Sequence, residues 1–440
     1  MVNLTERNIK KQLSSIYDQY INDVRNIDFS RQLSRQDSLI ELSEGEIVKL
    51  YSLQTLIRPL YGKGSPQIPQ IGDHPDFLEI KGTDKKIYCA ITTMFMDIVS
   101  STRLSLFYSL EEVQLIKNAF IRATIELIKC FDGHVHRIMG DAVMAYFGGK
   151  NIQEEIGIID GLNCASVLRY FVESVVSVGL ENRGFQENFG IRIGLDFGEK
   201  EDVLWTSYGY PGMDEVTATS FYVDVASKLQ HAAGKNKIMI GQSLRDYLDI
   251  PDDLLKIKTI KKNGAEMEVY YLTPNYTDKD NKLINYRQYI FDWEKYLQFS
   301  PVSQENYMMN DNNSQIKNIQ VTVKVYCSRD SKIQETTYYT CSNFINKHKE
   351  LKFIISLQSL IHLRPYRVKF IVQNHGKEAQ ELGGDNLGNH NESYLIQEND
   401  NTSYLEHWET TLYRGLHYMI IELSNHKGLQ RRTKLGIYVQ

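Results

Sequence analysis

The sequence has few cysteines, no long apolar run and little net charge, and each of these absences excludes a class of protein. Its 440 residues include five scattered cysteines, an odd number without paired spacing, which argues against a disulfide framework and a zinc site. No apolar stretch approaches the roughly 20 residues that cross a bilayer. The formal net charge of −5 gives no basis for bulk binding to nucleic acid or to an anionic membrane.

The remaining composition is that of an ordinary globular protein. Hydrophobic residues make up 42% and charged residues 24%. The first residues, Met1 to Asn8, lack the apolar segment of a signal peptide, so we expect a cytoplasmic protein. A chain of 440 residues is too long for one hydrophobic core, and two or three domains are expected.

Residues 1–80 are predicted to form a helical N-terminal region and a linker. Apolar residues recur there at helical spacing, namely Ile9, Leu13, Ile16, Tyr17, Tyr20 and Val24. Two roles remain open for this helix, a cap on the following domain or a dimerising element. Residues 61–78 contain several glycines and prolines and are predicted to be linker.

Residues 81–275 alternate strand and helix patterns and are predicted to form one α+β domain with helices on one face of its sheet. The predicted helices cover 110–131, 161–178 and 220–233. The predicted strands are 88–97, 135–138 and 191–197, with 237–241 and 266–272 closing the sheet. Residues 276–315 are polar and predicted to be linker. Residues 316–440 are predicted to form a small all-β sandwich, because 321–326, 368–372 and 412–423 read as strands between Gly- and Asn-rich loops.

Two aspartates end apolar runs that read as strands. Asp97 ends the run from Tyr88, and Asp141 ends the shorter run from His136. A carboxylate at a strand end can hold a divalent cation, and two such strands side by side can hold two cations over one phosphate. The alternative for either residue alone is that it caps the element that follows.

The surroundings of these aspartates resemble a known family. Phe95–Thr102 and Met139–Ala145 resemble the two metal-binding signatures of class III nucleotidyl cyclases, with the aspartates 44 positions apart. Ile191–Leu195 resembles the next core strand of that family, and Val216–Leu229 resembles its last signature helix. The resemblance implies a catalytic domain with a ferredoxin-like βαββαβ core.

The resemblance also implies a site and a reaction. Asp97 and Asp141 would bind two Mn²⁺ or Mg²⁺ ions, with the carbonyl of Ile98 as a further ligand. Backbone N–H groups of Val99, Ser100, Ser101 and Thr102 would bind phosphate oxygens at a helix start. The ribose 3′-hydroxyl would attack the α-phosphorus, which releases pyrophosphate and leaves a 3′,5′-cyclic nucleotide.

Several positions depart from the usual family pattern. Arg137 and Thr217 stand at the base-reading positions, Asp224 stands at the ribose-orienting position, and Lys228 stands at the transition-state arginine. Lys228 keeps the positive charge but not the bidentate fork. Lys261 or Lys262 matches a phosphate-binding lysine; the two are not distinguished by the sequence, and Lys262 is taken as the candidate. For each of these residues, a solvated helix or strand face is the alternative.

The resemblance extends to assembly. In the family, the metal ligands come from one subunit and the base-reading and transition-state residues come from its partner. Because this chain carries both sets, a head-to-tail homodimer with two equivalent sites is expected.

The C-terminal region narrows the expected function. Residues 316–440 resemble the AGS-C sensor domain, and the combination is similar to the pyrimidine cyclases of Pycsar antiphage systems. This implies CTP or UTP as substrate, a separate effector activated by the cyclic nucleotide, and a phage-derived trigger. Arg137 only donates hydrogen bonds, so it suits N3 or O2 of cytosine and favours CTP over UTP. The alternatives are a uridylate cyclase, an ordinary adenylate cyclase, with which Thr217 is compatible, and an inactive nucleotide-binding domain, which Asp224 and Lys228 favour.

Overall fold

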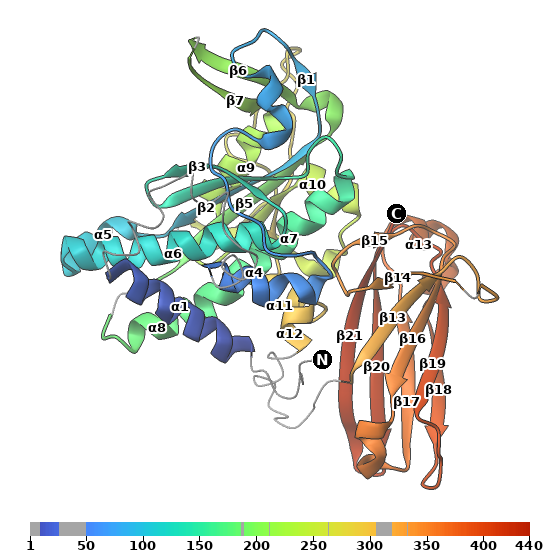
Figure 1. The fold of residues 1–440 in the computed structure, drawn as a ribbon. Helices are drawn as coiled ribbons and strands as arrows, with labels where there is room; N and C mark the ends of the chain where they lie inside the picture. Colours follow the sequence, from blue (N-terminus) through green and yellow to red (C-terminus); the bar gives the residue numbers. More distant parts are fainter. Residues whose placement is uncertain are drawn as a thin grey trace. The chain divides into compact units, whose positions relative to one another are not determined.

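The computed structural model divides the chain into two compact units (Figure 1). It describes residues 9–25, 50–185, 189–210, 212–262, 264–304, 319–331 and 333–440. The first unit comprises 1–59, 63–247 and 252–294, and the second comprises 60–62, 248–251 and 295–440. Within the described ranges, no helix has the length and apolarity needed to cross a membrane.

A seven-stranded mixed sheet forms the centre of the first unit, in the order β3-β4-β2-β5-β8-β12-β9. Its strands are β2 (Ile91–Ile98), β3 (His134–Met139), β4 (Ala142–Phe147), β5 (Ile191–Gly198), β8 (Ile238–Gly241), β9 (Leu255–Lys256) and β12 (Gln288–Phe291). The helices of the first unit include α5 (Ser101–Phe107), α6 (Leu110–Cys130), α7 (Glu154–Phe171) and α9 (Phe221–Ala232). The run β2-α6-β3-β4-α7-β5 has the predicted βαββαβ order, and β2 pairs antiparallel with both β4 and β5.

Helices cover both faces of this sheet, whereas the sequence predicted helices on one face only. Leu195 of β5 packs against Gly161 of α7. Its neighbour Gly194 lies so close to the backbone of α9, at Ala226 and Gln230, that a Cβ atom would overlap it. Consecutive strand residues face opposite sides, so α7 and α9 cover opposite faces.

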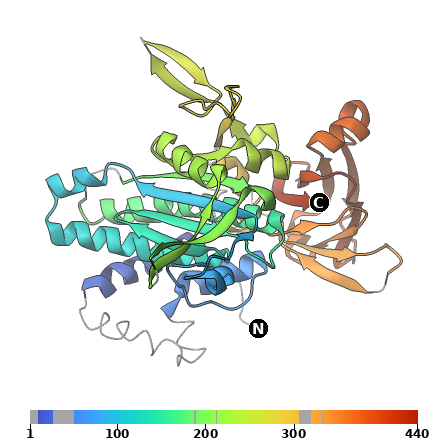
Figure 2. The same cartoon turned by 90° about the horizontal axis from the view of Figure 1, so that it is seen from above.

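Two strand assignments also differ from the prediction. β10 (Lys258–Lys262) and β11 (Ala265–Val269) pair only with each other, as a hairpin that extends from the first unit (Figure 2). The predicted closing strand 266–272 is therefore not part of the central sheet. Instead β12, from the region predicted to be linker, pairs with β8 and β9. A strand of four residues in a polar segment is too short for its periodicity to be read.

The described N-terminal helix packs against a helix of the first unit. The helix α1 (Ile9–Arg25) packs on α6 and buries Ile9, Leu13 and Tyr17. This is the predicted cap. Residues 61–78 are not simply linker, because Phe77 is fully buried and stacks on Trp205 with ring centroids 3.9 Å apart. Trp205 belongs to a three-stranded sheet of β1 (Ile87–Tyr88), β6 (Leu204–Tyr210) and β7 (Met213–Thr219).

The second unit is the predicted all-β sandwich. One sheet has the order β14-β13-β16-β19 and the other has the order β15-β21-β20-β17-β18. The strands are β13 (Val321–Tyr326), β14 (Gln334–Tyr338), β15 (Phe344–Ile345), β16 (Glu350–Ser356), β17 (Tyr366–Gln373), β18 (His390–Ile396), β19 (Tyr404–Thr410), β20 (Gly415–Asn425) and β21 (Gly428–Val439). Alternate residues of both sheets form one apolar core, as expected when two sheets pack face to face.

Candidate active site

The two aspartates lie at the same end of the central sheet. In the antiparallel pair β2–β4, Asp97 is directly opposite Ala142. Asp141 immediately precedes Ala142, in the two-residue turn that joins β3 to β4. Gly140 in this turn has a φ of +69°, a conformation that favours glycine. The hairpin thus brings Asp141 beside the end of β2 that carries Asp97.

Asp97 and Asp141 suit divalent cations whose remaining coordination positions are filled by a substrate. Both side chains are partly exposed, and carboxylate oxygens are the ligands that Mg²⁺ prefers. The described residues contain no cluster of three or more His, Cys, Asp or Glu side chains that would enclose a metal ion. A site of two carboxylates leaves coordination positions for phosphate oxygens and water, which is how Mg²⁺ is bound in nucleotide enzymes.

Arg192 is a site residue that the sequence did not indicate. Its Nε and Nη2 atoms donate to Oδ2 of Asp97 at 2.9 and 2.7 Å, and Gln230 donates to the same oxygen at 3.4 Å. Arg192 lies within the Ile191–Leu195 motif, but its position opposite Asp97 is a matter of strand register. A guanidinium fork also suits phosphate oxygens, so Arg192 can pair with either the carboxylate or a nucleotide phosphate.

The predicted phosphate-binding segment is partly occupied by the protein itself. The N–H of Val99 donates to the carbonyl of Gly190 at 2.9 Å and so has an acceptor already. Ser100 has a φ of 58° and caps α5, which begins at Ser101. The first turn of a helix leaves N–H groups without acceptors inside the helix. Of the four predicted phosphate-binding N–H groups, those of Ser100, Ser101 and Thr102 remain candidates.

Of the two predicted base-reading residues, Arg137 and Thr217, Arg137 pairs with Glu215. Arg137 on β3 donates from Nε to Oε2 of Glu215 at 3.0 Å, and its Nη2 pairs with Oε1. Val216 and Ala218 of β7 are buried, so the alternating residues Glu215 and Thr217 face the other side of that strand. Glu215 was not predicted, because its partner Arg137 is 78 positions away along the chain.

The predicted transition-state residues point away from Asp97 of the same chain. Lys228 lies over the ring of Tyr276, with Nζ 5.5 Å from the centroid, and the Tyr276 hydroxyl raises the pKa of Lys228. Gln230, two positions further along α9, is the residue that reaches Asp97. Residues two apart on a helix do not share a face, whereas Asp224 and Lys228, four apart, do. Lys261 is exposed on β10, and the side chain of Lys262 lies outside the described residues.

Comparisons with known proteins show the family to which this chain belongs. Residues 83–274 match the adenylate and guanylate cyclase catalytic domain, and residues 292–440 match the adenylyl/guanylyl and SMODS C-terminal sensor domain, AGS-C. A cytidylate cyclase of Escherichia coli is 35% identical, over 96% of this chain and 88% of that protein. A cytidylate cyclase of Staphylococcus aureus is 37% identical, over 82% of this chain and 81% of that protein. This chain belongs to the same family, the class III nucleotidyl cyclases with an AGS-C domain.

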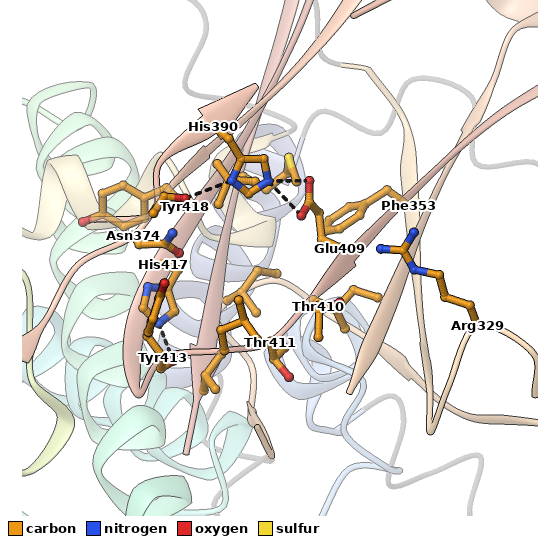
Figure 3. A pocket seen from close by; sticks show the side chains of 17 residues that line it. Arg329, Phe353, Asn374, His390, Glu409, Thr410, Thr411, Tyr413, His417 and Tyr418 are labelled. Atoms are coloured by element: carbon orange, nitrogen blue, oxygen red, sulfur yellow. Dashed lines mark hydrogen bonds and ion pairs between the residues drawn. The ribbon is translucent and has the colours of Figure 1, made fainter. Parts of the chain in front are cut away.

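The AGS-C domain of this cyclase contains a cavity between its sheets (Figure 3). Apolar side chains such as Phe353 and Met419 line the cavity, and His390 pairs there with Glu409 at 3.0 Å. His417 also lines it; burial lowers the pKa of His417 to about 4, so this ring is neutral at physiological pH. An apolar interior with charged and hydrogen-bonding groups beside it is typical of small-molecule sites.

Proposed function

We propose that this protein is a cytidylate cyclase, which converts CTP to 3′,5′-cyclic CMP and pyrophosphate. The observation that carries this proposal is the strand register that brings Asp97 beside the Asp141 turn. Relatives named as cytidylate cyclases, similar over most of this chain, support CTP as the substrate. Two divalent cations, Mn²⁺ or Mg²⁺, would be held by Asp97, Asp141 and the carbonyl of Ile98.

Bound cations would lower the pKa of the ribose 3′-hydroxyl and offset the charge of the triphosphate. The new bond joins O3′ to the α-phosphorus, the bond from that phosphorus to the bridging oxygen breaks, and pyrophosphate leaves. We assign the binding of phosphate oxygens to Arg192 and to the N–H groups of Ser100, Ser101 and Thr102. Asp224 would accept a hydrogen bond from ribose, Lys228 would offset transition-state charge, and Arg137 with Thr217 would contact the base. Lys261 or Lys262 would contact the outer phosphates.

A head-to-tail homodimer would complete the site. Because Lys228 is directed to Tyr276 and not to Asp97 of its own chain, a second subunit is needed to supply it. Large exposed apolar side chains lie on α5, at the start of α6 and on the β6–β7 hairpin, namely Leu106, Phe107, Leu110, Tyr208, Tyr210 and Met213. Such residues are typical of a surface that a partner covers.

Product analysis tests the proposed reaction. The purified full-length protein is incubated with Mn²⁺ and with ATP, GTP, CTP or UTP separately, and cyclic products are identified by mass spectrometry. Cyclic CMP as the main product is the expected result. Cyclic UMP or cyclic AMP as the main product would assign a uridylate or an adenylate cyclase. An absence of product from a folded, dimeric protein would contradict the proposal and favour an inactive nucleotide-binding domain.

We also propose that the enzyme is cytoplasmic, that its AGS-C domain responds to a phage-derived trigger, and that cyclic CMP activates a separate effector. The sensor description of this domain and its cavity support this role. Leu412 lines the cavity and is 49% exposed, so Leu412→Trp would place a larger side chain at the opening of the cavity. Leu395, 56% exposed on β18, does not line the cavity and gives the matched control Leu395→Trp. Only Leu412→Trp should reduce the rise of cyclic CMP in infected cells. An equal rise in both variants would exclude the cavity as the sensing site.

A further inference from the structure

We propose that Glu215, held by Arg137, makes the base pocket select cytosine over uracil. This inference rests on the proposed cyclase reaction and names the group that reads the 4-amino function of the base. The Arg137–Glu215 pair would place an acceptor and two donors in a row. That order complements the Watson–Crick edge of cytosine, where N4–H₂ donates and N3 and O2 accept.

The geometry of the pair leaves hydrogen-bonding capacity on both members. Two nitrogens of Arg137 are bound to the two oxygens of Glu215. A guanidinium has five N–H donors, and a carboxylate has about four acceptor positions. After pairing, Arg137 therefore retains unused donors and Glu215 retains unused acceptor positions. The side chains are 47% and 36% exposed, which leaves them accessible to a ligand. The pairing also restrains Arg137, so its remaining N–H groups are directed before a base arrives.

His136 adds a second acceptor on the inner side of Glu215. Its Nδ1 lies 3.0 Å from the carbonyl of Gly72, and a carbonyl only accepts, so Nδ1 carries the proton. Burial lowers the pKa of His136, which keeps the ring neutral and leaves a lone pair on Nε2. Nε2 has no hydrogen-bond partner in the described chain, its side chain is 1% exposed, and it lies 3.8 Å from Oε1 of Glu215.

A bulge in β3 produces this juxtaposition. The register with β4 shifts between Val135 and Arg137, so His136 has no partner on the neighbouring strand. Both His136 and Arg137 therefore approach Glu215, instead of facing opposite sides as consecutive strand residues do. Nε2 of His136 is buried beside Oε1 of Glu215, so the Glu215 carboxylate, 36% exposed, is the acceptor that a ligand can reach. An exocyclic amino group is the part of a nucleobase that an accessible carboxylate favours.

The other bases fit this edge less well. Uracil presents an acceptor at O4 to the carboxylate and a donor at N3 to the guanidinium, which are two mismatches. Guanine reverses the order in the same way, with O6 and N1–H. Adenine matches at N6 and N1 but has a C–H group where cytosine has O2, so one donor of Arg137 stays unpaired. A good polar match discriminates between bases by about tenfold to a hundredfold.

The variant Glu215→Gln tests the inference in the full-length enzyme. The amide keeps the size of the side chain but replaces one acceptor by a donor, which suits O4 of uracil. We expect the ratio of kcat/KM for CTP to that for UTP to fall at least tenfold, mainly through a higher KM for CTP. The control is Glu173→Gln, because Glu173 lies on a helix and pairs with Arg169 at 3.2 Å, whereas Glu215 lies on strand β7. A ratio that does not change, even when kcat/KM falls equally for CTP and UTP, would refute the inference.

A substrate analogue keeps the test valid if Glu215→Gln does not fold. On the wild-type enzyme, a CTP analogue with hydrogen in place of the 4-amino group should lose at least tenfold in kcat/KM. On Glu215→Ala the same analogue and CTP should react at similar kcat/KM. Equal use of both nucleotides by the wild type would refute the role of Glu215 and leave the proposed cyclase intact. An absence of cyclic CMP from wild-type protein would instead refute the proposed function itself.

Discussion

Arg192 and Asp97 are cross-strand neighbours on β5 and β2, and the Arg192 guanidinium donates two hydrogen bonds to one oxygen of the Asp97 carboxylate. The Arg192 guanidinium offsets the negative charge of a carboxylate that is proposed to bind metal ions. Cations at Asp97 would replace this charge and leave the guanidinium for a phosphate. The side chains are 28% and 17% exposed, so neither group is locked in the interior.

The variant Arg192→Lys should raise the KM for CTP by about tenfold or more, because lysine keeps the charge but loses the bidentate fork. Steady-state kinetics with CTP measures this. Arg432→Ala is the control, because Arg432 pairs with Glu422 inside the AGS-C domain, at 2.7 Å. An unchanged KM in Arg192→Lys would exclude a phosphate contact by this residue.

The variants Asp97→Asn and Asp141→Asn should each retain less than about 1% of the wild-type turnover, because both proposed cations need both carboxylates. Cyclic CMP formation with Mn²⁺ measures turnover, and thermal unfolding checks that the fold persists. Asp252→Asn is a control with an exposed carboxyl group, 84% exposed and paired with Arg245. Substantial turnover in either site variant would contradict the two-cation assignment.

Mixing two inactive variants should restore activity. Asp97→Asn removes a metal ligand and Lys228→Ala removes the proposed partner-supplied charge, so a heterodimer of the two has one intact site. With free subunit exchange, an equal mixture should recover about a quarter of wild-type activity. No recovery from a mixture that native mass spectrometry shows to be heterodimeric would mean that each chain completes its own site.

The variant Glu126→Gln should change how stability depends on pH. Glu126 of α6 accepts from the Tyr20 hydroxyl and, at 3.1 Å, from the N–H of Leu53. Burial raises the pKa of this carboxyl from 4.5 to about 7 in the folded state. Its contribution to stability is therefore complete below about pH 4.5 and is lost as pH rises through 7, since the unfolded chain ionises first.

Denaturant unfolding of wild type and Glu126→Gln at pH 5, 6, 7 and 8 measures this dependence. The difference in unfolding free energy between the two proteins should shift in favour of the glutamine variant as pH rises, and level off above pH 7. Asp18→Asn on α1 is a control, because Asp18 is half exposed and pairs with Arg183. If the difference in unfolding free energy did not change with pH, Glu126 would not have a raised pKa in the folded protein.

The strands and aspartates of the catalytic core could be predicted because their signals are local. Asp97 and Asp141 end apolar runs within a few residues, and α6 and β5 follow the periodicity of their own segments. Glu215 and Arg192 could not be assigned in the same way. Their partners, Arg137 and Asp97, are 78 and 95 positions away along the chain, and a shift of one residue in strand register would point these side chains to the opposite face.

The sequence by itself determined the kind of chemistry: two carboxylates at strand ends, the motifs of a class III cyclase, and a separate all-β domain. Only the tertiary structure decided which groups meet. It placed α7 and α9 on opposite faces of the sheet and left β10–β11 outside it. It also joined Arg137 to Glu215, and directed Lys228 away from Asp97. The physical reason is that composition and periodicity act over a few residues, whereas a site is assembled by sheet register, bulges and helix packing, which depend on contacts across the whole domain.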